Sequence, residues 1–226
     1  MVHQCVRYLT RSTRPEWDGE KGPFGNSTAT YSYGAIIVPE AAKDLLQTLG
    51  EQRDVDLLAS ETLSSANQGT DATLINIGQL LYFHLYAHNA PIISPDRRAN
   101  IEAKLRACAN DEKKITALSR CMPPTNFLPA NSLLLYHLVK FLNTISWKAK
   151  SQRNGRKVLA PVFCGIIGLG EVETKLLIGS YQKILCPLYQ DNDKNVFWLE
   201  EEHGKKTTSW SVRAMSSDDD YDAPSA

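Results

Sequence analysis

The chain has 226 residues, of which 42% are hydrophobic and 22% charged, and its 25 basic and 25 acidic residues give a formal net charge of zero. This length and composition suit one well-buried globular core, and the lack of a basic excess argues against nucleic acid as the main partner. The N-terminal residues lack the apolar region of a signal peptide, and no apolar run approaches the ~18 residues that span a bilayer. We therefore expect a cytoplasmic protein whose recruitment to membranes would run through its partners.

Composition divides the chain into four segments. The first is rich in Gly, Pro, Ser and Thr without a sustained period, which predicts a flexible arm. The last, MSSDDDYDAPSA, has the acidic composition of a disordered tail. We expect a flexible arm at 1–35, a helical domain at 36–190, an extension that can form a short hairpin at 191–214, and an acidic tail at 215–226.

Helical signals dominate the central segment. Pro39 suits the first turn of a helix that Gly50 stops. A second helix can be capped by Thr70 or Asp71 and should end before Pro91. Its apolar residues recur at helical spacing: they are Leu74, Ile77, Leu81 and Leu85.

The later helices begin with equally clear signals. Ser94-Pro95-Asp96 combines a capping hydroxyl, a proline at the first helical position and an acid near the positive end of the helix dipole. A short helix is expected at Asp111–Cys121, and a long one starts near Pro129.

The last part of the domain is less uniform. Lys148–Arg156 is polar and contains a glycine, which predicts a loop. Val158–Ile167 is nearly all apolar, so periodicity alone leaves buried helix and buried strand both open. Glu171–Leu185 returns to helical spacing, and Pro187 should close it. The fold class expected is mainly α, with an α bundle of about six to eight helices.

Four short motifs follow one another in this central segment. HNAPII at His88–Ile93 closes one helix, LPANSLLLYHLVKFL starts at Leu128, VLAPVF starts at Val158, and KLLIGSYQKIL occupies Lys175–Leu185. In this order they resemble the Rho GTPase-activating (RhoGAP) domain, whose pattern runs roughly LPEPLI, LPxxNxxLL, NLAxVF and LIxNYxxIF. The matching positions are Pro91, Leu128, Pro129, Asn131, Leu159, Ala160 and Phe163.

The catalytic element of that family does not match. Active RhoGAP domains carry an arginine in a loop resembling GLFRxSG, and such a finger is worth roughly 10³–10⁵ in rate. The corresponding stretch is DLLASETL at Asp56–Leu63, with Ala59 in place of the arginine. Two further polar family positions, a lysine and an asparagine, correspond to Tyr82 and Val158. The resemblance therefore implies a degenerate member.

Arg53 leaves an alternative open. No arginine occurs between Arg53 and Arg97. A loop shifted by several residues would let Arg53 act as the finger; otherwise it is a solvated cation at the negative end of a helix dipole.

The resemblance implies a non-enzymatic interaction module in signal transduction. Its partner would be a Rho-family small GTPase (Rho, Rac or Cdc42 type) or an adaptor peptide, and the contacting residues expected are Arg53, Tyr82, Arg97 and Arg98. The GAP-like domain of type II inositol polyphosphate 5-phosphatases, which also lacks the finger, is the nearest analogy. The alternative is an atypical but active GTPase activator that uses Arg53.

Other site chemistries are weakly signalled. The five cysteines are widely spaced without a C-x-x-C pair, which favours buried reduced thiols. His84, His88 and His137 lack an accompanying acid or cysteine pattern, so core or surface positions are favoured over metal ligation. Gly168-x-Gly170 hints at dinucleotide binding, but Glu173 replaces the third glycine. We expect no metal and no cofactor.

Overall fold

The computed structural model describes residues 2–13, 15–17, 23–24, 71–87 and 91–189. Within these residues the chain is mainly helical and contains no strand, which confirms the predicted mainly α class. The helix predicted between Pro39 and Gly50 and the hairpin predicted in 191–214 lie outside them. The described elements are α1 (Val2–Ser12), α4 (Asp71–Ala87), α5 (Pro95–Arg106), α6 (Asp111–Cys121), the 3₁₀ helix η1 (Pro124–Asn126), α7 (Pro129–Lys148), α8 (Gln152–Ile167), α9 (Glu171–Gly179), α10 (Tyr181–Ile184) and α11 (Cys186–Tyr189).

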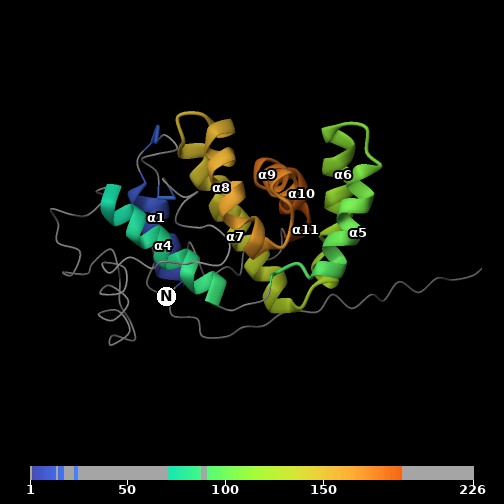
Figure 1. Ribbon diagram of the computed structural model, residues 1–226, viewed down its shortest axis with the longest axis horizontal. Helices are drawn as coiled ribbons and strands as arrows, with labels where there is room; N and C mark the ends of the chain where they lie inside the picture. The colour runs from blue at the N-terminus through green and yellow to red at the C-terminus, as the bar shows by residue number, and fades with distance from the viewer. Residues whose placement is uncertain (1, 14, 18–22, 25–70, 88–90, 190–226) are drawn as a thin grey trace, which may run out of the picture.

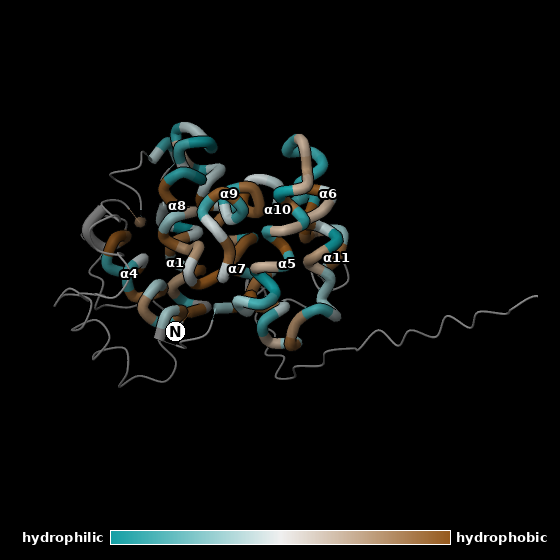
Figure 2. The backbone as a smooth tube through the Cα atoms, turned by 45° about the vertical axis from the view of Figure 1, so that its right-hand side comes forward, coloured by the Kyte–Doolittle hydropathy of each residue, from teal (hydrophilic) through white to brown (hydrophobic). Residues whose placement is uncertain are grey.

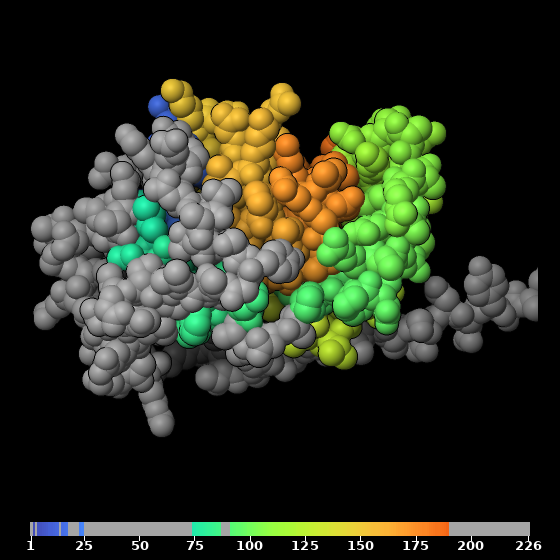
Figure 3. All heavy atoms as spheres, in the orientation of Figure 1, coloured from blue at the N-terminus to red at the C-terminus, as the bar shows by residue number. Residues whose placement is uncertain are grey.

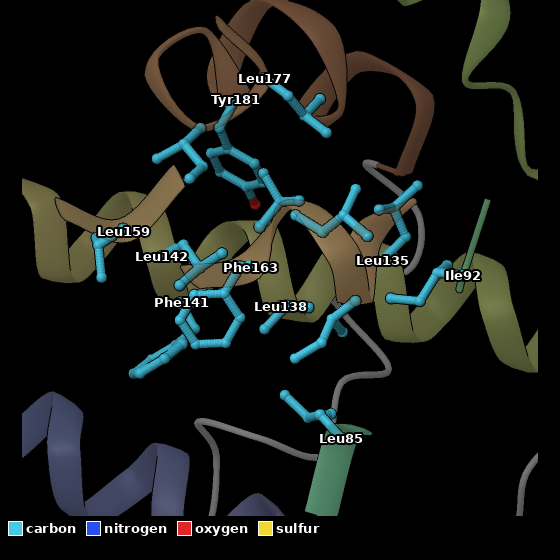
Figure 4. Packing of buried hydrophobic residues seen from close by; sticks show 14 of the residues in the cluster. Leu85, Ile92, Leu135, Leu138, Phe141, Leu142, Leu159, Phe163, Leu177 and Tyr181 are labelled. Carbon is cyan, nitrogen blue, oxygen red and sulfur yellow. The ribbon is translucent and has the colours of Figure 1, made fainter. Parts of the chain in front are cut away.

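Helix α7 runs through the centre of the molecule and packs against α8 and α9, while α1 packs against α4 beside it (Figure 1). Its residues Leu135, Leu138, Leu142 and Ile145 are buried at helical spacing, and Tyr136, Val139 and Phe141 are buried on its other sides. The helix therefore lies within the core on nearly all sides. The hydrophobic parts of the backbone gather around α7 and α8, and the outer turns are hydrophilic (Figure 2). Figure 4 shows Phe141 and Phe163 among the buried side chains of these two helices, with Tyr181 above them and Leu85 below.

The segment between α4 and α5 is fixed to the end of α8. The N–H groups of Ile92 and Ile93 donate to the carbonyls of Ile166 and Ile167 at 3.0 and 2.9 Å. These carbonyls belong to the last turn of α8, where helical partners are missing. Gly168 ends that helix in the left-handed region, with φ +84°. The link therefore serves as the cap of α8.

The first two helices after this link begin close to where the sequence predicts. Helix α6 starts at Asp111 because the Asn110 side chain accepts from the Lys113 N–H at 2.9 Å. Ser94 does stand at the N-cap of α5, but its side chain makes no capping hydrogen bond. Pro95 and the acid Asp96 in the first turn remain the local reasons for that start.

The N-terminal arm was predicted wrongly over Val2–Ser12, which is helix α1. Cys5, Tyr8 and Leu9 are fully buried, and their spacing of three and four residues is that of one helix face. Phe24, farther along the predicted arm, is also fully buried and lies edge-on to Phe163 with ring centroids 5.0 Å apart. The composition of the whole first segment is rich in Gly and Pro, and this average conceals the apolar face of the helix at its start.

The ends of α1 and α7 cap each other. The Nζ of Lys148, at the end of α7, donates to the carbonyl of Thr10 and, at 3.0 Å, to that of Thr13. In return, the Trp17 indole N–H donates to the Ile145 carbonyl at 3.0 Å. Burial lowers the pKa of Lys148, yet its ammonium group still faces the negative end of α1.

We expect Lys148→Met to lower the free energy of unfolding by about 1–2 kcal/mol, because two carbonyls at the end of α1 lose their donor. Lys150→Met is the matched control, since Lys150 is exposed two residues farther on. Its effect should stay within about 0.5 kcal/mol. Urea unfolding followed by far-ultraviolet circular dichroism measures both values, and equal losses in the two variants would contradict the capping role.

Three predicted boundaries in the last third differ from the structure. The predicted loop Lys148–Arg156 is shorter, because α8 already begins at Gln152. The single helix predicted over Glu171–Leu185 breaks at Ser180, whose φ of −113° and ψ of 20° leave the helical region. Pro187 does not close the segment, since it lies inside the short helix α11.

Contacts between different elements explain the first two changes. The buried Asn143 side chain donates to the Ile178 carbonyl at 2.8 Å and so satisfies the end of α9. Arg156 lies across Gly179, where a Cβ would come within 2.0 Å of its Nη1 atom. Gly155 presses against Ala149 and Ser146, which turns the chain directly from α7 into α8.

Candidate interaction site

The positions that would hold the arginine finger lie outside the described residues. These are Ala59 and the alternative Arg53. The remaining predicted site residues are all described, and they fall into three regions: the contact between α4 and α8, the start of α5, and the junction that links the predicted motifs.

The first region centres on Tyr82 of α4. Its side chain is only 6% exposed, and its ring lies edge-on to Phe163 of α8 at 6.1 Å. A ring held this way is a core side chain, which does not fit the predicted role in partner binding. Its other face stacks on Tyr86 at 5.9 Å, and Tyr86 is 39% exposed. The aromatic surface of α4 therefore belongs to Tyr86, one helical turn beyond the residue that the sequence indicated.

The predicted motif in α8 is structural. Leu159, Ala160 and Phe163 are fully buried, and Val158 is half-buried at the edge of the same core. Pro161 stands inside this helix and removes one backbone donor. An apolar valine at position 158 therefore adds to packing and offers no hydrogen bond to a partner.

The second region holds the two arginines of α5, and both make contacts within the chain. Arg97 donates to the Asn126 carbonyl, and its guanidinium lies 4.6 Å from the centre of the Phe127 ring. Arg98 pairs with Glu102 at 2.6 Å, one turn along the same helix. Arg97 thus joins α5 to η1, and only part of the Arg98 side chain faces outward. The structure does not bring either arginine next to Tyr82.

The third region joins two of the predicted motifs to the end of the helix that contains a third. The Asn131 amide, in the first turn of α7, donates to the Ile92 carbonyl at 3.4 Å. Ile92 in turn donates to Ile166 at the end of α8. Pro91 lies against Gly168, and Leu128, just before Pro129, is 71% exposed. The motif beginning at residue 88, the start of α7 and the end of α8 therefore meet at one place.

Burial raises the pKa values of two cysteines and a tyrosine in the described part of the chain. Burial raises the pKa of the Cys5 thiol to about 12 and also raises that of Cys164. The pKa of Tyr189 is raised by burial too, and its hydroxyl lies 3.0 Å from that of Ser132. Thiols held protonated in this way are poor nucleophiles.

The described part of the chain gives no support to metal binding, dinucleotide binding or a membrane-spanning helix. It contains no group of three or more His, Cys, Asp or Glu side chains placed to hold a metal ion. Gly168 follows helix α8 rather than a strand, so the glycines there do not form a dinucleotide-binding turn. None of the described helices is both long and apolar enough to cross a membrane.

We compared the chain with protein-family models and with curated protein sequences. No protein-family model matches the chain, and no curated protein sequence matches it.

Proposed function

We propose that this chain is a non-catalytic RhoGAP-like module that binds a Rho-family small GTPase. The observation that supports the proposal is the junction of Asn131, Ile92 and Ile166, where residues of two motifs contact the end of the helix that contains the third.

We expect no catalysis because the chain lacks a positive side chain at the position of the arginine finger. GTP hydrolysis builds negative charge on the transferred phosphoryl group, and an inserted guanidinium neutralises it. Ala59 has no charge to offer, and Tyr82 and Val158 replace two polar groups of the family pattern. Binding would then depend on shape and apolar contact, to which Tyr86 contributes an exposed ring.

The first test measures binding and hydrolysis together. Purified Rho- and Rac-type GTPases, loaded with a non-hydrolysable GTP analogue, should bind the full chain with roughly micromolar affinity, because a flat helical face without an arginine anchor lacks the main hot spot. With GTP itself, the chain should leave the hydrolysis rate unchanged. Acceleration that Arg53→Ala abolishes would establish the alternative, an active protein with Arg53 as the finger.

A gain-of-function variant sharpens this test. Ala59→Arg should raise the hydrolysis rate at least about tenfold, since a complete finger supplies roughly 10³–10⁵. Ser60→Arg is the matched control, because it adds the same charge one position away. Equal rates for both variants would contradict the assigned loop register. If the chain neither binds nor accelerates any Rho-family GTPase, the proposal fails and an adaptor peptide becomes the partner to test.

A further inference from the structure

The turn between α7 and α8 concentrates positive charge, and its own segment of the sequence contains no acid. No Asp or Glu occurs between Glu112 and Glu171, whereas Lys148, Lys150, Arg153, Arg156 and Lys157 lie within one short stretch. The whole chain has zero net charge, so this excess is local. A neutral protein with one strongly basic turn has a defined place for an anionic partner.

Two of these five cations are used inside the fold. Lys148 caps α1, and Arg156 donates to the Gln152 carbonyl at 3.2 Å and lies against Gly179. Lys150, Arg153 and Lys157 are exposed, and within the described part of the chain none of the three forms an ion pair. Their charges therefore face solvent.

Trp147 lies beside these charges and is 59% exposed, although tryptophan is usually covered. The turn is tight, since a Cβ on Gly155 would lie 2.9 Å from that of Ala149. Arg153 and Lys157 stand one helical turn apart at the start of α8. We call the exposed set Trp147, Lys150, Arg153 and Lys157 the basic tip.

The basic tip breaks a local rule of helix stability. Cations at the start of a helix oppose its positive dipole end, and the first turn of α8 contains no acid. The Ser151 side chain also makes no capping hydrogen bond. The fold brings Glu16 close by, because the Trp17 carbonyl accepts from the Lys150 N–H at 2.9 Å. Among the described residues, this one carboxylate leaves a positive excess beside three exposed cations. Local conflicts of this kind are expected at functional surfaces.

The tip projects from the body of the molecule. In Figure 3 the gold atoms of the α7–α8 turn stand above the orange surface of α9, and the same turn is hydrophilic in Figure 2. A projecting tip suits a flat partner better than a peptide or a nucleic acid strand, which bind in grooves. Lysines and arginines beside one exposed indole are also the combination that favours the interface of an anionic bilayer.

We propose that the basic tip docks the protein on an anionic lipid surface. The cations contact lipid headgroups, and the Trp147 ring enters the interfacial layer between headgroups and acyl chains. This contact is peripheral, and it is independent of whether the chain binds a GTPase.

The test is vesicle flotation of the full chain. Vesicles of phosphatidylcholine with phosphatidylserine should carry the protein, vesicles of phosphatidylcholine alone should not, and added salt should weaken the binding. Each basic residue close to an anionic bilayer strengthens binding about fivefold, so Lys150→Gln/Arg153→Gln/Lys157→Gln should reduce it at least about tenfold. Trp147→Ser should also reduce it, with all charges kept.

The matched control removes three exposed cations elsewhere. Lys104→Gln/Lys113→Gln/Arg120→Gln changes the net charge equally on α5 and α6 and should leave binding within about twofold. Thermal melting of every variant separates loss of binding from loss of folding. The proposal is overturned if wild-type protein does not float with anionic vesicles, or if both triple variants lose binding equally. It is also overturned if a homopolymeric RNA binds at the tip while vesicles do not.

Discussion

Gly168→Ala should be among the most damaging single substitutions in the described fold, with an expected loss of about 3 kcal/mol or more. Two costs add. Alanine disfavours the left-handed φ of +84°, and its Cβ would lie 2.2 Å from the Ile93 carbonyl oxygen and 2.8 Å from the Pro91 Cβ. Both obstacles belong to backbone or ring atoms that are themselves fixed, so local movement cannot relieve the contact.

The loss extends beyond α8. Separating Ile93 from Gly168 also strains the bonds by which Ile92 and Ile93 cap α8, and with them the contact to Asn131. We therefore expect a fall in melting temperature of the order of 10 °C. Thermal unfolding followed by circular dichroism measures it.

Gly170→Ala is the matched control. Gly170 has a negative φ of −67°, and its Cβ would meet the carboxyl ends of the flexible Glu173 and Glu102 side chains, with the closest atom a Glu173 oxygen at 2.3 Å. Its cost should be less than about 1 kcal/mol. If the two variants melt together, the left-handed cap of α8 is not the constraint that we describe.

The sequence predicts helices best where the signals are local. Helix α6 has the predicted bounds because Asn110 and the acids after it act within one turn. Pro95 and Pro129 mark the starts of α5 and α7 for the same reason. The stretch Val158–Ile167 could not be assigned by periodicity, because a helix buried on most sides has no polar face to reveal its period.

The sequence predicts boundaries least well where they depend on contacts between different elements. The early start of α8 depends on Gly155 meeting Ser146 and Ala149, and the break after α9 depends on Asn143 and Arg156. From the sequence alone, a glycine or a polar residue predicts a loop, because the residue that it contacts in the fold is not yet known. The composition of the first segment hides α1, because the glycines and prolines lie outside Val2–Ser12, whereas the spacing of Cys5, Tyr8 and Leu9 is that of a helix face.

The candidate site shows the same division. The order of the motifs could be read from the sequence, but the burial of Tyr82 could not, because a tyrosine suits core and surface equally. The spacing of Tyr82 and Tyr86 by four residues was the available signal for their stacking. For Arg97, the carbonyl of Asn126 and the ring of Phe127 become neighbours only after α5, α6 and η1 fold together.

The other large effect is expected at Trp17. This residue is 6% exposed and pairs through an isolated parallel bridge with Ala149. Its indole donor satisfies the Ile145 carbonyl, which lacks its usual helical donor because the Ala149 N–H bonds to Ser146 instead. Trp17→Ala should cost about 3–5 kcal/mol, since it removes both the buried ring and the donor.

Trp17→Phe divides that loss into its two parts. Phenylalanine keeps most of the apolar volume but leaves the Ile145 carbonyl without a donor, so we expect a cost of about 1–2 kcal/mol. Urea unfolding by circular dichroism gives both values. A phenylalanine variant as unstable as the alanine variant would mean that the hydrogen bond, and not the ring, holds the N-terminal segment to the end of α7. If both variants are as stable as wild type, α1 and Trp17 do not anchor this segment at all, and the mutual capping of α1 and α7 is wrong.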